Sequence, residues 1–325
     1  MGTVELPVVV GVDGSDAASD ALDWAAELAG RRGLPLRVVH ASLWERYEGY
    51  VAGTAADRPA ERLHSEAVLA TAAERAGRRV PALKVMTDLA ADDAVTALLR
   101  AGQSAEALVV GSRGRGEFAS LLLGSVGLGI AARAQCPVVV VRGRPENVHG
   151  GMNRVVVGIA ERERRSEREP VPPSAAVAFA LREARLRGGE LEAVHAWRCA
   201  GPEDHGAREN HRAPQDHTAR ENHGAREDHT ARENHRARED HARRAAELLD
   251  ETLGGATAAG LPPVPVAHRP VEGSARKALL DASAHADLLV VGARRRQGHF
   301  GMQLGLVNHA VLHHAKCPVA VVPVS

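Results

Sequence analysis

The chain repeats itself, and this repeat constrains its fold more than any other feature of the sequence. Residues 105–141 read AEALVVGSRGRGEFASLLLGSVGLGIAARAQCPVVVV, and residues 286–322 read ADLLVVGARRRQGHFGMQLGLVNHAVLHHAKCPVAVV. Three pairs of residues are each 181 positions apart: Gly111 and Gly292, Gly124 and Gly305, and Cys136 and Cys317. Farther upstream, VVVGVD (8–13) matches VVVGIA (155–160). Because 325 residues also suffice for two domains, we predict homologous domains at 1–145 and 152–325.

Each copy alternates apolar runs with stretches of helical periodicity. In the first copy the expected strands are 6–13, 35–41, 81–87, 105–111 and 136–142, and the expected helices are 15–33, 57–79, 92–104 and one that begins near Gly124. Valine-rich runs of this length are typical of strands buried on both faces of a parallel sheet. The fold class that follows is α/β, with two tandem doubly wound five-stranded parallel sheets. Ligands of such sheets bind beyond the carboxyl ends of the strands, where the loops after strands one and four face one another.

The loop after the fourth strand of the first copy is rich in glycine. Gly111 is followed after two residues by Gly114, and after nine more by Gly124 and Ser125. Glycines allow positive φ and a close approach of backbone N–H groups to an anion, and a helix that begins near Gly124 points its positive dipole end the same way. The spacing is neither GxxxxGK[ST] nor a GxGxxG after the first strand. A phosphate cradle and a tight turn without a ligand both remain open on spacing alone.

Together with Asp13 after the first strand, this loop resembles the universal stress protein domain. ATP-binding members of that family carry G-x2-G-x9-G-[ST] after strand four and an aspartate after strand one. The resemblance covers residues of about 5–143 and 152–325, and it implies the strand order 3-2-1-4-5 in each domain. It also implies an ATP site, with or without Mg²⁺, in the first domain.

The resemblance further implies a role for each site residue. Asp13 would bind near the ribose, and the backbone of Val39, His40 and Ala41 would border the adenine. The phosphates would be surrounded by Gly111, Arg113, Gly114, Gly124, Ser125 and Val126. For Arg113, an exposed loop arginine without a ligand is an equally open interpretation.

The second copy departs from this motif. Arg295 stands at the position of Gly114, Leu306 at that of Ser125, and Ala160 at that of Asp13. A side chain at 295 obstructs close backbone approach, and a leucine donates no hydroxyl to phosphate. We expect the second domain to have lost nucleotide binding by this route.

An insertion of low complexity, 203–246, occupies the second domain where the helix after its second strand belongs. Histidine recurs every six residues from His205 to His241, within units such as HTAREN and HRARED. The stretch 201–247 contains no Phe, Trp, Tyr, Val, Ile, Leu, Met or Cys, so we expect a solvated helix or a disordered arm. Histidines six apart form three sparse stripes on a helix rather than one row of metal ligands. Adventitious metal binding or pH sensing by histidine is the alternative.

Two pairs of residues occupy matching positions in both copies. His40 and His195 stand at strand ends, where each either borders a ligand or makes a structural hydrogen bond. Cys136 and Cys317 precede prolines at the start of the last strand of each copy, and we interpret them as small buried hydrophobic residues.

Composition limits the compartment and the partners. With 41 basic and 41 acidic residues the formal net charge is zero, so we expect no nucleic acid and no membrane as partner. Three scattered cysteines, and neither a signal peptide nor an apolar stretch long enough for a membrane helix, lead us to expect a cytoplasmic protein. In the family resembled here the fifth strands pair across a dimer, which implies a homodimer or an intramolecular pseudo-dimer.

The functional hypothesis is an ATP-binding stress-response protein that acts through nucleotide-dependent conformational or partner switching. We interpret it as a binder rather than an enzyme, with at most slow ATP hydrolysis, because no general base or nucleophile is recognisable near the loop. Two alternatives stay open: an interaction scaffold that binds no nucleotide, and an ATP-hydrolysing or adenylyl-transferring relative of the same architecture.

Overall fold

The computed structural model describes residues 5–43, 57–113, 123–160, 174–198, 223–254, 263–294 and 304–324. Several residues of interest lie outside these ranges: Gly114, Cys199, Arg295 and the hexads of 205–222. None of the described helices is long and apolar enough to cross a membrane.

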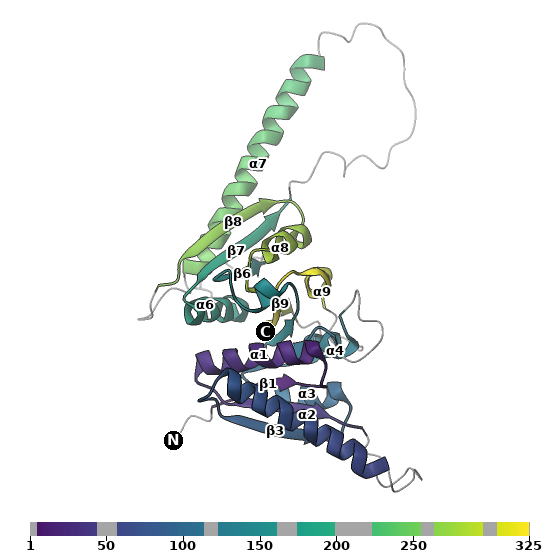
Figure 1. Ribbon diagram of the computed structural model, residues 1–325. Coiled ribbons are helices and arrows are strands. Elements are labelled where there is room, and N and C mark those ends of the chain that lie inside the picture. The colour runs from purple at the N-terminus through teal and green to yellow at the C-terminus, as the bar shows by residue number, and fades with distance from the viewer. Residues whose placement is uncertain are drawn as a thin grey trace, which may run out of the picture.

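The elements alternate along the chain as strand and helix (Figure 1). The first half comprises β1 (Val8–Gly11), α1 (Asp16–Arg32), β2 (Leu36–Ala41), α2 (Asp57–Arg79), β3 (Val85–Ala90), α3 (Ala94–Gly102), β4 (Ala107–Gly111), α4 (Ser125–Arg133) and β5 (Val138–Val141). A short helix that the sequence did not predict, α5 (Pro145–Val148), joins the halves. The second half comprises β6 (Arg154–Ile159), α6 (Ala175–Arg187), β7 (Glu190–Trp197), α7 (His223–Gly254), β8 (Val266–Glu272), α8 (Ala275–Ser283), β9 (Leu288–Arg294), α9 (Leu306–His314) and β10 (Val319–Val324).

The strands form one sheet of ten, in the order β3-β2-β1-β4-β5-β10-β9-β6-β7-β8. The α/β class and the largely parallel pairing agree with the prediction, and each half follows the order 3-2-1-4-5. The two predicted five-stranded units are continuous in one sheet, because β5 and β10 pair antiparallel and join the halves. Each of these valine-rich strands would otherwise be an unpaired edge, which exposes backbone N–H and C=O groups. The pseudo-dimer contact through the fifth strands is therefore made within this chain.

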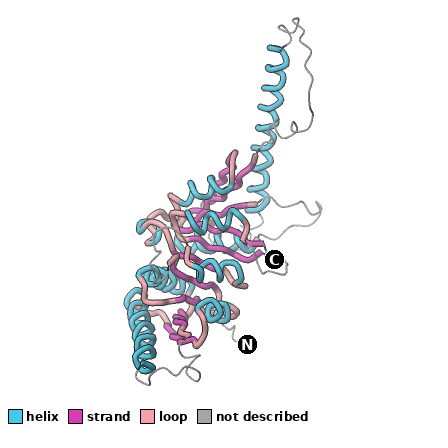
Figure 2. Tube along the Cα trace, turned by 90° about the vertical axis from the view of Figure 1, so that its right-hand side faces the viewer, coloured by secondary structure: helices cyan, strands magenta, loops and turns pink. Residues whose placement is uncertain are grey.

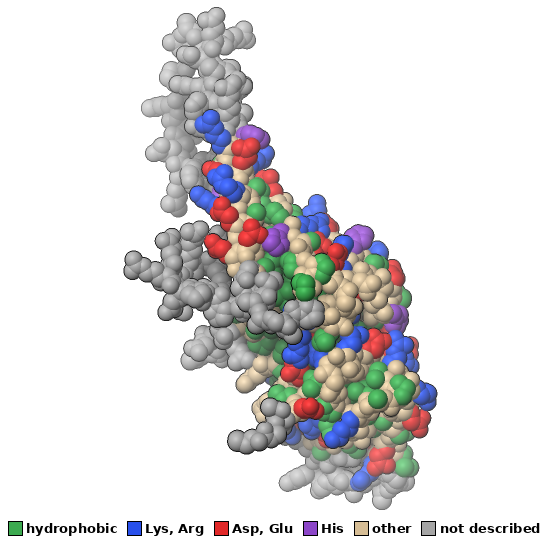
Figure 3. All heavy atoms as spheres, turned by 90° about the vertical axis from the view of Figure 1, so that its left-hand side faces the viewer, with side chains coloured by type: hydrophobic (Ala, Val, Ile, Leu, Met, Phe, Trp, Pro, Cys, Tyr) green, Lys and Arg blue, Asp and Glu red, His purple; other side chains and the backbone are tan. Residues whose placement is uncertain are grey.

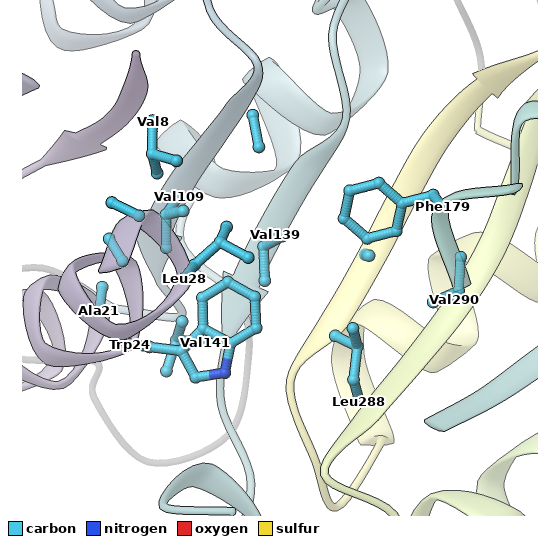
Figure 4. Close-up of a cluster of buried hydrophobic side chains, with 14 of the residues drawn as sticks. Val8, Ala21, Trp24, Leu28, Val109, Val139, Val141, Phe179, Leu288 and Val290 are labelled. Carbon is cyan, nitrogen blue, oxygen red and sulfur yellow. The ribbon is translucent and has the colours of Figure 1, made fainter. Parts of the chain in front are cut away.

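Helices cover both faces of the sheet and bury two apolar cores. Side chains of α1, α2, α6 and α7 pack on one face, and those of α3, α4, α8 and α9 pack on the other. Successive residues of a strand serve opposite faces, as Val138 and Val139 do. On the first face, Trp24 and Leu28 of α1 lie against the valines of β4 and β5, with Phe179 of α6 across the junction (Figure 4).

Local sequence signals explain most element boundaries. The Ser15 hydroxyl accepts a hydrogen bond from Ala18 N and caps α1, and Gly33 ends the helix with a φ of 67°. The third strand was predicted at 81–87, but β3 begins only at Val85. A turn at 80–83, closed by the Leu83 N to Val80 O hydrogen bond of 3.0 Å, occupies the segment where the strand was expected. Because β3 is an edge strand with a half-exposed face, its apolar pattern marks the boundary poorly.

The described hexads are part of α7, a helix of 32 residues whose first part projects from the molecule (Figures 1 and 2). Its last turns pack on the sheet through Ala245, Leu249 and Leu253, which are buried. Farther out, acidic and basic side chains alternate along the described part of the arm (Figure 3), and pairs such as His235 Nε2 with Glu239 Oε1 at 3.2 Å link successive turns. Such pairs stabilise an isolated helix by about 0.2–0.5 kcal/mol each. The hexads therefore extend a core helix outward.

A buried ion network joins α1 to α6 beside the strand junction. Arg32 donates to Glu183 Oε1 from Nη2 at 2.6 Å and from Nε at 3.0 Å, and its Nη1 donates to Glu106 at 2.8 Å. The side chains of Arg32 and Glu183 are 1% and 0% exposed. Arg32 also lies over the Phe179 ring, 4.9 Å from its centroid. The halves are thus fastened by charged groups as well as by backbone pairing.

Candidate nucleotide site

The candidate site lies at the carboxyl edge of the first-half strands. Val12 N donates to Val39 O at 2.9 Å just beyond β1, and Ser112 N donates to Val141 O at 3.0 Å just beyond β4. These bonds continue the parallel ladders into the loops. The β1 loop, the end of β2 and the start of the β4 loop consequently meet at one edge, as the sequence predicted for a doubly wound sheet.

Asp13 is held in a fixed orientation in the loop after β1. Its Oδ1 accepts hydrogen bonds from Ser15 N at 3.0 Å and from Ser15 Oγ at 2.6 Å. Ser15 in turn caps α1, so the carboxylate is attached to a rigid helix start. Among the described residues Oδ2 accepts no hydrogen bond, which leaves it as the acceptor for a hydroxyl group of a ligand.

Gly111 is required by packing between α1 and β4. A Cβ at this position would lie 2.5 Å from Ala17 O and 2.7 Å from Ala17 C. Its counterpart Gly292 is less crowded, because a Cβ there would lie 2.9 Å from a methyl of Val324, which is a side-chain atom. The sequence grouped Gly111 with the phosphate residues, and the structure gives it a packing role that would keep it glycine without any ligand.

Gly124 has no such packing reason to be glycine. Its φ of −62° and ψ of 153° suit any residue, and a Cβ would come no nearer than 3.6 Å to Ser112 O. Gly124 begins α4 without a side-chain cap, whereas α1, α3, α6 and α8 each begin with a serine or aspartate that caps the helix. The first-turn N–H groups of α4, including those of Ser125 and Val126, have no intrahelical acceptor. This helix start therefore offers bare N–H donors beside an exposed Ser125.

The end of β2 supplies backbone rather than side chains. His40 is buried, with its Nδ1 2.8 Å from Val12 O, and His195 in the second half is 2.9 Å from Ile159 O in the same way. Both histidines thus tie the end of the second strand to the first, which is the structural interpretation. Val39 is also buried, with its carbonyl in the sheet ladder, so Ala41 is the most accessible of the three residues assigned to the adenine. Arg113 is exposed at the start of the β4 loop.

Strand register aligns the two halves independently of the sequence motif. Val8 lies opposite Ala107 in the first half, and Val155 lies opposite Leu288 in the second. Counting on from these residues places Ala160 at the position of Asp13. Leu306 stands at the position of Ser125 and is 91% exposed. The second edge therefore lacks both the carboxylate and the hydroxyl.

The buried cysteines take no part in the site. Burial raises the pKa of the Cys136 thiol to about 11, and it raises the pKa of the Cys317 thiol still further. We expect iodoacetamide at pH 8 to label both far more slowly than a free thiol, for Cys136 by roughly a hundredfold because so little thiolate forms. Mass-spectrometric mapping of folded protein and of protein in guanidinium checks this. Rapid labelling of the folded protein would contradict the burial.

Two further features lie apart from this edge. A groove of about 550 Å³, lined by residues such as Gly33, Leu34 and Lys84, is at the opposite, amino edge of the strands. Within the described residues no group of three His, Cys, Asp or Glu side chains is placed to hold a metal ion.

Comparison with known proteins identifies a family. A family model described as the universal stress protein family matches residues 6–142 and 169–323. A universal stress protein from Mycobacterium bovis is 34% identical over 97% of this chain and 96% of its own length. One from Mycolicibacterium smegmatis is 30% identical over 98% and 97% of the two chains.

A solved structure that spans the whole chain shows the same architecture. The crystal structure of a universal stress protein from Archaeoglobus fulgidus matches 99% of both chains, with a TM-score of 0.64 at 17% identity. A universal stress protein solved in complex with cAMP matches 43% of this chain and 99% of its own, with 28% identity and a TM-score of 0.35.

Proposed function

Because the chain belongs to the universal stress protein family, we propose that its first domain is an ATP-binding module of the stress response, in which nucleotide occupancy changes shape or partners. The observation that carries this is the uncapped start of α4 at Gly124, at the same sheet edge as the oriented carboxylate of Asp13. The second half keeps the sheet and an uncapped helix start, that of α9 at Gly305, but it has Ala160 and Leu306 in place of Asp13 and Ser125. The two edges therefore differ in these side chains and not in scaffold.

The phosphates would lie at the start of α4. Free N–H groups and the positive end of the helix dipole favour an anion there. Gly124 leaves room for close approach, and the Ser125 hydroxyl adds a donor. The absence of a bulky side chain at Gly114, which lies outside the described residues, belongs to the same proposal. Gly111 contributes through the fold, and its own N–H and C=O belong to the end of β4.

The nucleoside would lie across the ends of β1 and β2. Oδ2 of Asp13 is the acceptor for a ribose hydroxyl, since Ser15 already occupies Oδ1. The backbone at Ala41, with Val39 and His40 behind it, borders the base. A bound Mg²⁺ would shield the phosphate charge. The residues named here bind and orient a nucleotide, and we assign none of them to hydrolysis.

The site is tested by replacing two residues of the first sheet edge with the residues at the equivalent positions of the second half. The double variant Asp13→Ala and Ser125→Leu copies Ala160 and Leu306. We expect it to weaken ATP binding by about 100-fold, because a charged hydrogen bond contributes about 1.5–3 kcal/mol and a neutral one about 1 kcal/mol. Isothermal titration calorimetry with Mg-ATP measures the change.

The control is Leu306→Ser, which alters an exposed residue at the equivalent helix start and should leave ATP binding unchanged. Wild-type protein that gives no heat at about 1 mM nucleotide would overturn the proposal. It would favour the scaffold interpretation instead. Steady release of ADP or pyrophosphate would favour the enzymatic one.

A further inference from the structure

The start of α4 is in direct contact with the second half of the chain. Leu123, the residue before Gly124, donates from its backbone N to Nδ1 of His313 on α9 at 3.3 Å, and Figure 1 shows α9 beside α4. His313 is 8% exposed. Because Nδ1 accepts, the neutral ring carries its proton on Nε2. That Nε2 is buried without a hydrogen-bond partner among the described residues.

A second donor, Arg142, reaches the same junction from the first half. Arg142 follows β5 directly, and its Nη1 donates to Leu312 O, the carbonyl just before His313. Its Nε is buried and, within the described residues, has no acceptor. Burial lowers the pKa of Arg142, and the charge of Arg113 at the β4 loop lowers it further. Two guanidinium groups and a buried imidazole are thus gathered at one place.

Among the described residues, no carboxylate contributes to the pKa shifts of Arg142 and His313. The basic neighbours that lower the pKa of His313, after burial itself, are His309, His314 and Arg142. The His309 ring lies 4.4 Å from that of His313, centroid to centroid. A buried donor without an acceptor costs about 1–3 kcal/mol, and more where it is charged. His313 Nε2 and Arg142 Nε are two such donors, and a bound anion near the uncapped start of α4 would accept hydrogen bonds from both.

The arrangement is present on only one side of the pseudo-dimer. By the offset of 181 residues, His313 corresponds to Ala132 and Arg142 to Pro323. Neither alanine nor proline has a side-chain donor, so the second edge receives nothing comparable from the first half. Both donors, one from each half, converge on the edge that keeps Asp13 and Ser125.

We propose that His313 and Arg142, assisted by Arg113, form an interdomain phosphoryl-binding site next to the start of α4. Its ligand is a phosphate dianion, which accepts from His313 Nε2 and Arg142 Nε. For a nucleotide bound as proposed above, this is the terminal phosphate of a triphosphate, and in that form the inference rests on the proposed function. Free inorganic phosphate presents the same chemistry. The second half, which lacks its own nucleotide motif, would then report occupancy of the first through α9.

The double variant Arg142→Met and His313→Ala tests the site. Calorimetric titration with AMP and with ATP should show unchanged affinity for AMP and an affinity for ATP lowered by about 10-fold to 100-fold, the range of one to two charge-assisted hydrogen bonds. Unchanged AMP binding also shows that the variant is folded. The matched control is Arg133→Met, at the other end of α4, where the exposed guanidinium donates to Gly129 O of the same helix. It should leave both affinities unchanged.

The outcomes separate this inference from the proposed function. If the double variant has the same ratio of ATP affinity to AMP affinity as the wild type, the proposed subsite is overturned, although nucleotide binding itself is still supported. If wild type binds no nucleotide, the proposed function fails, and titration with inorganic phosphate alone decides the subsite. Phosphate binding that the double variant loses supports it, and binding that is absent or unchanged overturns it.

Discussion

Replacing Glu183 with alanine is expected to destabilise the folded protein by about 3–5 kcal/mol, the cost of removing one partner from a buried ion pair. Glu183 is fully buried, and its Oε1 accepts two hydrogen bonds from Arg32. Its Oε2 lies 3.6 Å from Nε of Arg187. The variant leaves Arg32 with Glu106 as its remaining carboxylate partner, and it removes the carboxylate beside the buried Arg187, whose pKa burial already lowers.

Urea unfolding followed by circular dichroism measures this loss. The matched control is Glu190→Ala, which breaks the ion pair with Arg154 at a site where both side chains are more than a third exposed. It should cost less than about 1 kcal/mol, because water solvates the charges that remain. Arg32 and Glu183 belong to different halves. We therefore also expect the halves of the variant to separate at a lower urea concentration than those of the wild type. Equal effects of the two substitutions would refute the interdomain network.

Much of the fold could be predicted because short stretches of sequence determine where its strands and helices begin and end. Valine runs mark strands, Ser15 and Gly33 mark the ends of α1, and the repeat predicts that the same order of strands and helices occurs twice. The joining of the sheets could not be derived from one copy. It depends on Val138 and Val140 finding Val321 and Val319 almost two hundred residues away, and no periodicity encodes that partner.

The candidate site divides in the same way. The loop with Gly124 and Ser125 was singled out by its spacing and Asp13 by the family resemblance, and the structure brings the loops after β1 and β4 to one edge of the sheet. Gly111 and Gly124 look alike in the sequence, but only contact with Ala17 separates a packing glycine from one that leaves space for a ligand. His313 and Arg142 were missed, because a contact across 190 residues has no local signal. The one clue in the sequence was their absence from the other copy, where Ala132 and Pro323 stand.

Substituting Gly143 with alanine is the second change for which we expect a large loss of stability. Gly143 follows β5 with a φ of 110°, a conformation that L-residues rarely adopt. A Cβ there would lie 2.1 Å from Lys316 O, the carbonyl that also accepts from Arg144 N at 3.0 Å. The crowding atoms belong to the backbone of Lys316 and Cys317, between α9 and β10, so they cannot move aside as a flexible side chain would. Strain and displacement together should cost about 3–5 kcal/mol.

Gly150→Ala provides the control, since it changes a glycine of the same linker with a φ of 79° and no neighbour nearer than 3.9 Å. The Gly150→Ala variant should lose only the stability that an L-residue loses in a left-handed conformation, about 1–2 kcal/mol. The difference between the two variants in urea unfolding therefore isolates the clash with Lys316. Because Arg142 directly precedes Gly143, the first variant should also displace the guanidinium from Leu312 O and weaken binding at the interdomain site. A Gly143 variant no less stable than the Gly150 variant would mean that the backbones of the two halves are farther apart here than the structure places them.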